Sequence, residues 1–157
     1  MIIVRKATRN DAEQMAALLN GIIRIGGTTA HRTEFDAVRM FEHYIASEHS
    51  ISCVVAMDEG EVLGFQSLAW PDPKHHDPSS IAPDWGIIAT FAKVGRTQSG
   101  IGTTLFKHTL VAARQAGATS IDATIRHENT GGQAYYRKMG FRTYRQSVDT
   151  VSKEFRI

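Results

Sequence analysis

Two short segments in the second half of the chain hold residue types that suit catalysis. The first is a glycine turn, Gly100-Ile101-Gly102, between a strand-like run and a helical stretch. Glycine lets the backbone turn tightly and approach a ligand closely, and the unpaired amides that open a helix attract phosphate. The second segment places Tyr136 four residues before Gly140. Together they indicate a phosphate-bearing ligand with a proton donor near its reactive end, although a plain strand-to-helix turn also explains the glycines.

Two common phosphate-binding motifs do not fit this turn. A P-loop requires a lysine and then a serine or threonine directly after its second glycine. Here Gly102 is followed by Thr103 and Thr104. A dinucleotide-binding fingerprint requires a third glycine where this chain has Leu105. The turn therefore argues against nucleotide hydrolysis and hydride transfer.

The two segments resemble motifs of the GNAT superfamily of acyl-CoA-dependent N-acyltransferases, closest in type to the phosphinothricin and methionine-sulfoximine acetyltransferases. In that family a Gln/Arg-x-x-Gly-x-Gly/Ala loop opens the helix that binds the pyrophosphate of coenzyme A. An Asn…Tyr-x-x-x-Gly-Phe segment supplies the last helix and its catalytic tyrosine. The chain departs from the loop pattern at Thr97. It matches at Gly100, Gly102, Asn129, Tyr136, Gly140 and Phe141.

The resemblance implies acetyl-CoA as cosubstrate, a small-molecule amine as acceptor, and no metal. It also implies that the strand runs 85–94 and 120–125 splay apart, so that the pantetheine amides pair with the free edge around Thr90. Asn129 would help to hold the cofactor, although capping of the last helix alone would explain it. We expect Arg96 and Arg137 at the phosphates, although Arg137 also suits a helix C-terminus. The predicted cofactor-binding residues are Phe91, Ala92, Arg96, Thr97, Gln98, Ser99, Gly100, Ile101, Gly102, Thr103, Asn129 and Arg137.

Acetyl transfer to an amine needs a neutral amine, donors for the oxyanion and a proton for the departing thiolate. Tyr136 occupies the position of the family's general acid, and a core aromatic is the structural alternative. Tyr135 cannot replace it easily, since adjacent helical side chains point about 100° apart. The glutamate base of some relatives would fall at Ile87, so the nearest carboxylate, Asp84, is the predicted base. The alternatives are His31, Glu34, His127 and a water chain.

The connection between the first two predicted helices, residues 26–31, resembles a small polar segment of the phosphinothricin and methionine-sulfoximine acetyltransferases. We expect this connection and the 71–83 loop to determine specificity for a small polar amine, such as an amino acid or its analogue. A plain connecting loop is the alternative. The predicted substrate residues are Thr28, Thr29, Arg32 and Trp70.

The order of predicted elements fits the same family over nearly the whole chain. Apolar residues at the 3–4 spacing mark a first helix that Asn10 caps and Gly26 ends. The strand–helix–strand unit around the glycine turn requires a parallel strand pair. We therefore predict one three-layer α/β domain over residues 1–157, with a mixed, mostly antiparallel sheet and helices on both faces. The predicted strands are 2–5, 51–57, 61–69, 85–94, 120–125, 142–147 and 150–156, and the later helices are 34–46, 100–115 and 130–138.

The composition is that of an ordinary globular protein. Of the 157 residues 42% are hydrophobic, and the formal net charge of +2 is too small to demand nucleic acid as a partner. The sequence shows no signal peptide or membrane span, and its single cysteine, Cys53, fits a reducing compartment. We therefore expect a cytoplasmic protein, and family likeness predicts a homodimer.

The sequence also raises three alternatives to a small-molecule acetyltransferase. His75-His76-Asp77 is the densest potential metal cluster. Neighbouring side chains in an extended loop point to opposite sides, however, so we expect no metal there. A non-catalytic acyl-CoA-binding module would retain the cofactor site without turnover. An enzyme acting on protein N-termini or lysines would need a more open groove.

Overall fold

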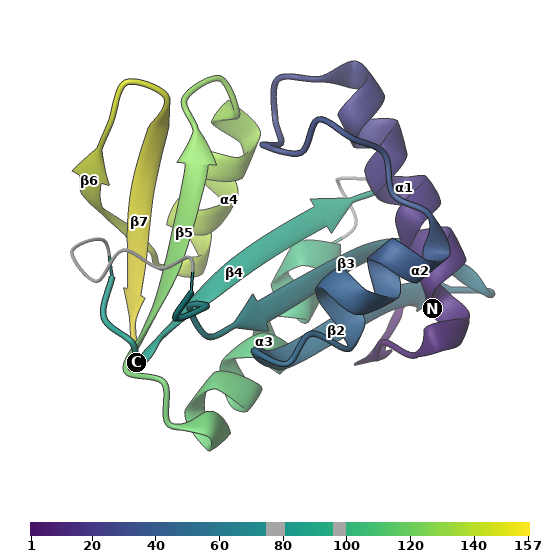
Figure 1. Cartoon of the computed structure of the whole chain (residues 1–157), viewed down its shortest axis with the longest axis horizontal. Coiled ribbons are helices and arrows are strands. Elements are labelled where there is room, and N and C mark those ends of the chain that lie inside the picture. Colours follow the sequence, from purple (N-terminus) through teal and green to yellow (C-terminus); the bar gives the residue numbers. More distant parts are fainter. Residues whose placement is uncertain (75–80, 96–99) are drawn as a thin grey trace.

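Seven strands form one mixed sheet in the computed structural model (Figure 1). The structure describes residues 1–74, 81–95 and 100–157. The strand order is β1-β2-β3-β4-β5-β7-β6, and β4 and β5 are the parallel pair, which confirms the predicted sheet. The strands are β1 (Ile3–Lys6), β2 (Ser50–Asp58), β3 (Glu61–Ala69), β4 (Trp85–Ala92), β5 (Ser120–Arg126), β6 (Arg142–Gln146) and β7 (Thr150–Arg156).

Helices cover both faces of this sheet, as predicted. Figure 1 shows α1 (Ala12–Ile25) and α2 (Ala37–Met40) in front of the sheet, with α3 (Ile101–Ala116) and α4 (Thr130–Met139) behind it. Successive strand residues point to opposite faces, and the core follows this rule at β2. Val55 is buried with residues of α1 and α2, whereas Val54 is buried with residues of α3. We call these two sides the α1/α2 face and the α3/α4 face.

The first helix begins differently from the sequence-based expectation. Asn10 does not cap it, and the chain instead makes a 3-10 turn over Arg9–Asp11 before α1 starts at Ala12. The Asp11 carboxylate accepts from the Thr8 amide at 2.7 Å and from the Arg5 guanidinium at 2.8 Å. The Arg5 guanidinium also holds the pKa of Asp11 below its ordinary value. A capping box is therefore present, as predicted, but Thr8 and Asp11 form it, two residues before the predicted position.

The second predicted helix, 34–46, is shorter and interrupted. Asp36 caps α2 through the Arg39 amide, and after Met40 the chain continues as a π-helical turn over Phe41–Ile45. Such turns re-aim side chains and occur often at functional sites. Here the turn lies next to the connection 26–36 and carries Tyr44, whose hydroxyl reaches His31.

The parallel strands β4 and β5 are hydrogen-bonded at their N-terminal ends and separate toward their C-terminal ends. They pair through Trp85 with Ser120, Gly86 with Ile121 and Ile87 with Asp122. Beyond Ile87, β4 keeps its pairing with β3 alone and β5 keeps its pairing with β7 among the described residues. Figure 1 shows the two arrows diverging from their shared base. The splay that the family resemblance implied is present, and β4 has a free edge from Ile88 onward.

Residues 1–74, 81–95 and 100–157 contain neither a helix long and apolar enough to cross a bilayer nor a group of three metal-binding side chains. The sequence candidates His75, His76 and Asp77 lie outside the described residues.

Candidate active site

Tyr136 reaches from α4 to the open part of β4. Its hydroxyl lies 2.8 Å from the hydroxyl of Thr90, which belongs to the part of β4 that β5 does not pair. The side chain is 6% exposed and packs edge-on against Phe141, with ring centroids 5.1 Å apart. Burial raises the pKa of Tyr136 well above its ordinary value, and the hydrogen bond with Thr90 offsets part of that rise. The phenol is therefore protonated at neutral pH and can act as an acid.

The glycine turn opens α3 in the way the sequence predicts. Gly100 precedes the helix with φ of +73°, a conformation that strains other residues. The first helical bond runs from the Thr104 amide to the Gly100 carbonyl at 3.2 Å. The amides of Ile101, Gly102 and Thr103 thus precede the ladder and suit a phosphate oxygen. The predicted loop residues Arg96, Thr97, Gln98 and Ser99 lie outside the described residues.

Gly102 has a packing role that the sequence did not reveal. A Cβ atom at this position would lie 2.5 Å from Cε1 of Tyr135, so only glycine leaves room for that ring. The Tyr135 hydroxyl then donates to the Gly102 carbonyl at 2.7 Å. The expectation that these adjacent side chains diverge does not hold here, because the ring centroids of Tyr135 and Tyr136 lie 5.0 Å apart, although their hydroxyls bond to different elements.

Gln66 connects the two tyrosines and was missed by sequence reasoning. Its Nε2 atom lies 2.9 Å from Thr90 Oγ1 and 3.0 Å from the Tyr135 hydroxyl. The side chain is completely buried on the α3/α4 face of β3. The signal that could have identified it is a large amide within the mostly apolar run 61–69.

Asn129 caps α4 and ties it to the first helix connection. Its Oδ1 accepts from the Gly132 amide at 2.9 Å, and its Nδ2 donates to the Thr28 carbonyl at 3.3 Å. The capping explanation is therefore confirmed, while cofactor contact stays a prediction. Arg137 is exposed in the last turn of α4, and Phe91 and Ala92 end β4 beside the splay.

The predicted base, Asp84, lies away from these groups. It is exposed, and it precedes β4 at the end where β4 and β5 are joined. Six residues of extended strand separate it from Thr90, about 20 Å along the chain. The structure therefore does not bring Asp84 and Tyr136 together, because Asp84 lies at the start of β4 and Tyr136 contacts Thr90 near the other end of the same strand.

Among the alternative bases, His31 lies nearest the free edge of β4. Its ring is half-buried and 6.3 Å from that of Phe91, and its Nε2 is 2.6 Å from the Tyr44 hydroxyl. Burial lowers the pKa of His31, and the nearby His43 and Arg39 lower it further. Glu34 forms an exposed ion pair with Arg24 at 2.6 Å, and His127 contacts the Ser147 carbonyl at 2.8 Å.

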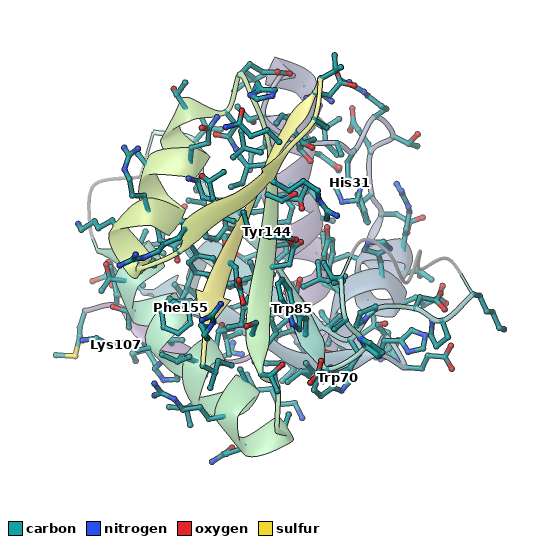
Figure 2. The ribbon with its side chains drawn as sticks, turned by 90° about the vertical axis from the view of Figure 1, so that its left-hand side faces the viewer. His31, Trp70, Trp85, Lys107, Tyr144 and Phe155 are labelled. Carbon is teal, nitrogen blue, oxygen red and sulfur yellow. The ribbon has the colours of Figure 1, made fainter. Side chains whose placement is uncertain are left out.

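The substrate residues proposed from the sequence divide into two places. The 26–31 connection spans the opening, because Thr28 contacts Asn129 at the start of α4 while His31 reaches Phe91 of β4. Trp70 lies at the other end of the sheet, after β3, and Figure 2 shows it far from His31. Thr29 is buried and accepts from the His31 amide, whereas Thr28 and Arg32 are exposed.

A buried carboxyl marks the point where the strands part. Asp122 on β5 is the register partner of Ile87, the last paired residue of β4. It accepts from the Tyr144 hydroxyl at 2.6 Å and from Thr124 at 3.0 Å. Burial raises the pKa of Asp122, and its charge opposes ionisation of Tyr136, which raises the pKa of Tyr136 further. Sequence reasoning missed it because the register between β4 and β5 is a tertiary property.

Comparison with known proteins agrees with this architecture. Residues 17–141, more than half of the chain, match the Acetyltransferase (GNAT) family. The sequence has no significant match among curated proteins. A GCN5-related N-acetyltransferase from Kribbella flavida has a similar structure, with a TM-score of 0.84, 17% identity, and coverage of 99% of this chain and 98% of that one.

Two further solved structures show the same fold at low identity. A phosphinothricin acetyltransferase from Sinorhizobium meliloti, solved in complex with acetyl-CoA, has a TM-score of 0.82 and 17% identity, covering 99% of this chain and 88% of that one. A ribosomal-protein-alanine N-acetyltransferase from Brucella melitensis has a TM-score of 0.77 and 19% identity, with 99% of each chain covered. The chain therefore belongs to the GNAT family of acetyltransferases.

Proposed function

We propose that this acetyltransferase moves the acetyl group of acetyl-CoA to the primary amine of a small polar substrate, by direct attack in a ternary complex. The observation that carries the proposal is the buried Tyr136 hydroxyl beside the free edge of β4. A protonated phenol at this place suits an acid that protonates the departing thiolate.

Three features support the cofactor's place in the splay. The free edge of β4 offers the backbone groups of Ala92 to the amides of the pantetheine arm, while those of the neighbouring Phe91 face β3. The amides of Gly100–Thr103 at the start of α3 suit the pyrophosphate. Residues 96–99, Asn129 and Arg137 complete the proposed cofactor set. The thioester then lies between Tyr136 on the α3/α4 face and the His31 side of the opening.

His31 is the proton acceptor that the geometry favours over Asp84. Since its pKa is lowered, the imidazole is neutral at physiological pH and can take a proton from the substrate's ammonium group, which frees the nitrogen lone pair for attack. Its contact with Tyr44, whose pKa burial raises, holds the ring in place. The exposed Thr28 and Arg32 flank this side and are the proposed contacts for the polar part of the acceptor.

An acetyl transfer assay with a panel of amines tests the proposal. Thiol release from acetyl-CoA would be followed with phosphinothricin, methionine sulfoximine, free amino acids, polyamines and a peptide with a free N-terminal alanine. We expect turnover on a small amino-acid-like amine, and a loss of about 10²-fold or more in kcat in Tyr136→Phe. Acetyl-CoA should raise the melting temperature of both proteins equally.

Other outcomes of this assay would point to other functions. Preference for the peptide would favour a protein acetyltransferase, the activity named for the Brucella melitensis relative. Stabilisation by acetyl-CoA without turnover on any amine would favour a non-catalytic binding module. A homodimer in the cytoplasm is the expected state, and sedimentation equilibrium checks the oligomer.

A further inference from the structure

The two neighbouring tyrosines of α4 belong to one buried hydrogen-bond chain. It links the Gly102 carbonyl to Tyr135, then to Gln66, Thr90 and Tyr136. The successive contacts are 2.7, 3.0, 2.9 and 2.8 Å. The chain therefore connects the glycine turn of α3 with the hydroxyl that we propose as the proton donor.

The directions of the first three bonds follow from the first member of the chain. A carbonyl can only accept, so the Tyr135 hydroxyl gives its one proton to Gly102. The Tyr135 oxygen is then left to accept, which requires the amide of Gln66 to turn Nε2 toward it. An amide nitrogen carries two hydrogens, and the second one points to Thr90 Oγ1.

Thr90 passes this direction on to Tyr136. Its oxygen accepts from Gln66, so its own hydroxyl hydrogen is available to the Tyr136 oxygen 2.8 Å away. When Thr90 is the donor in this bond, the proton of Tyr136 is the one hydroxyl proton that the chain does not use. Hydrogen bonding of this kind also stabilises the phenolate, consistent with the effect of Thr90 in lowering the pKa of Tyr136.

This arrangement leaves one buried polar atom without a hydrogen-bond partner in the part of the chain that the structure describes. Oε1 of Gln66 is buried and has no hydrogen-bond partner among the described residues. The reversed amide would satisfy Oε1 with the hydroxyls of Thr90 and Tyr135. It would also take the Tyr135 donor from Gly102 and leave Tyr136 to donate to Thr90. The present orientation keeps the bond from the Tyr135 hydroxyl to the Gly102 carbonyl, but it leaves a buried acceptor without a described partner, which is unfavourable.

We infer that Gln66, Thr90 and Tyr135 are positioning residues that keep the hydroxyl proton of Tyr136 free for the leaving thiolate. The inference rests on the proposed function. The amine nitrogen bonds to the carbonyl carbon, and the carbon–sulfur bond then breaks with its electron pair on sulfur. Sulfur takes the Tyr136 proton, His31 has taken one proton from the ammonium group before attack, and the second proton of the amine nitrogen passes to solvent. The phenolate accepts from Thr90 until proton exchange with solvent restores both groups.

Paired variants at Thr90 separate a positioning role from a packing role. Thr90→Val keeps the shape and removes the hydroxyl, whereas Thr90→Ser keeps the hydroxyl. We expect kcat to fall about tenfold or more in Thr90→Val and Gln66→Met, with KM for acetyl-CoA within about threefold of wild type. Thr90→Ser should stay close to wild type. Equal rates in Thr90→Val and Thr90→Ser would overturn the inference.

A spectroscopic measurement tests the chain without turnover. Tyrosine labelled with 13C at Cζ gives a signal for Tyr136, assigned by its loss in Tyr136→Phe, and this signal depends on whether the hydroxyl donates or accepts. We expect it to shift in Thr90→Val, in Gln66→Met and in Tyr135→Phe, which frees the amide at its far end. Thr143→Val, which removes a threonine hydroxyl bonded to Lys153, is the control and should not shift it.

The two measurements also distinguish failure of the inference from failure of the proposed function. An unmoved Tyr136 signal in Tyr135→Phe and Gln66→Met would overturn the chain even in an active acetyltransferase. Full turnover in Tyr136→Phe would overturn the donor role, and with it the catalytic purpose of the chain, whatever the signals show.

Discussion

The two faces of the sheet bring different kinds of side chain to the splay of β4 and β5. On the α3/α4 face, hydroxyls and one amide form a directed hydrogen-bond chain that ends at Tyr136. On the α1/α2 face, aromatic and imidazole rings pack mostly edge to face, and His31 makes its side-chain hydrogen bond to Tyr44. The rings around His31 are Phe35, His43, Tyr44 and Phe91.

This difference shows two ways of preparing a group for proton transfer. On the α3/α4 face the proposed chain fixes where a proton points, because Tyr135 and Gln66 have defined partners and the Tyr136 proton is left free. The α1/α2 face adjusts how readily a proton is held, because burial among rings disfavours the charged imidazole and lowers its pKa. An acid needs the first property and a base at neutral pH needs the second.

The largest effect on the α1/α2 face is expected from His31→Gln, which keeps a polar partner for Tyr44 and removes the base. At pH 7 we expect kcat/KM for the amine to fall about 10²-fold, with the acetyl-CoA-induced rise in melting temperature unchanged. The deficit should shrink as pH rises toward about 10, near the pKa of an alkyl ammonium group, because the free amine then needs no base. Rates measured from pH 7 to 10 check this, and a constant deficit would count against the base role.

A second prediction tests the packing of Gly102 against Tyr135 on the α3/α4 face. In Gly102→Ala the new methyl group lies within 2.5 Å of the Tyr135 ring, so the ring must move and lose the Gly102 carbonyl. We expect a loss of about 1–3 kcal/mol in the free energy of unfolding and weaker binding of acetyl-CoA. Chemical denaturation and titration calorimetry measure the two effects.

Gly131→Ala is the matched control for that substitution. A Cβ atom at Gly131 meets nothing within 4 Å, and the residue lies in the first turn of α4. The change should leave stability equal or raise it by up to about 1 kcal/mol, since alanine favours helix. Equal destabilisation by both substitutions would show that the Tyr135 contact is unimportant.

The smallest expected effect concerns pH and stability on the α1/α2 face. Burial is the main cause that lowers the pKa values of both His31 and His43. The unfolded chain therefore binds more protons than the folded one below about pH 6.5, and folding stability should fall as pH drops through and below that value. Melting temperatures between pH 5 and 8 measure the slope. His31→Gln and His43→Gln should each flatten it, and unchanged slopes in both variants would contradict the assignment.

Local patterns predicted most of the fold and the cofactor side of the site. Strand-like runs and the 3–4 spacing located the seven strands and the long helices, and glycine at positions 100 and 140 opened and ended helices as expected. Tyr136 was identified by its distance from Gly140, and the structure places it beside the free edge of β4. These features depend on residues close in sequence, so the sequence carries them directly.

The errors and omissions share a different physical origin. Asp84 is close to β4 in sequence, yet strand direction sets it apart from Tyr136. Gln66 and Asp122 were missed because strand pairing places them at the site. Gln66 pairs with Thr90 across β3 and β4, and Asp122 pairs with Ile87 across β4 and β5. Trp70 follows the same logic, since it lies at the end of the sheet opposite His31.

The sequence by itself thus determined the element order and the GNAT motifs, among them Tyr136 as the proposed acid, because helix ends, strand runs and tight turns are local consequences of residue type. The tertiary structure alone decided which groups meet at the splay and in which direction their hydrogen bonds run. Those properties depend on strand register and on side chains from β3, β4, α3 and α4 that are far apart along the chain. A pattern of residue types does not encode such distances.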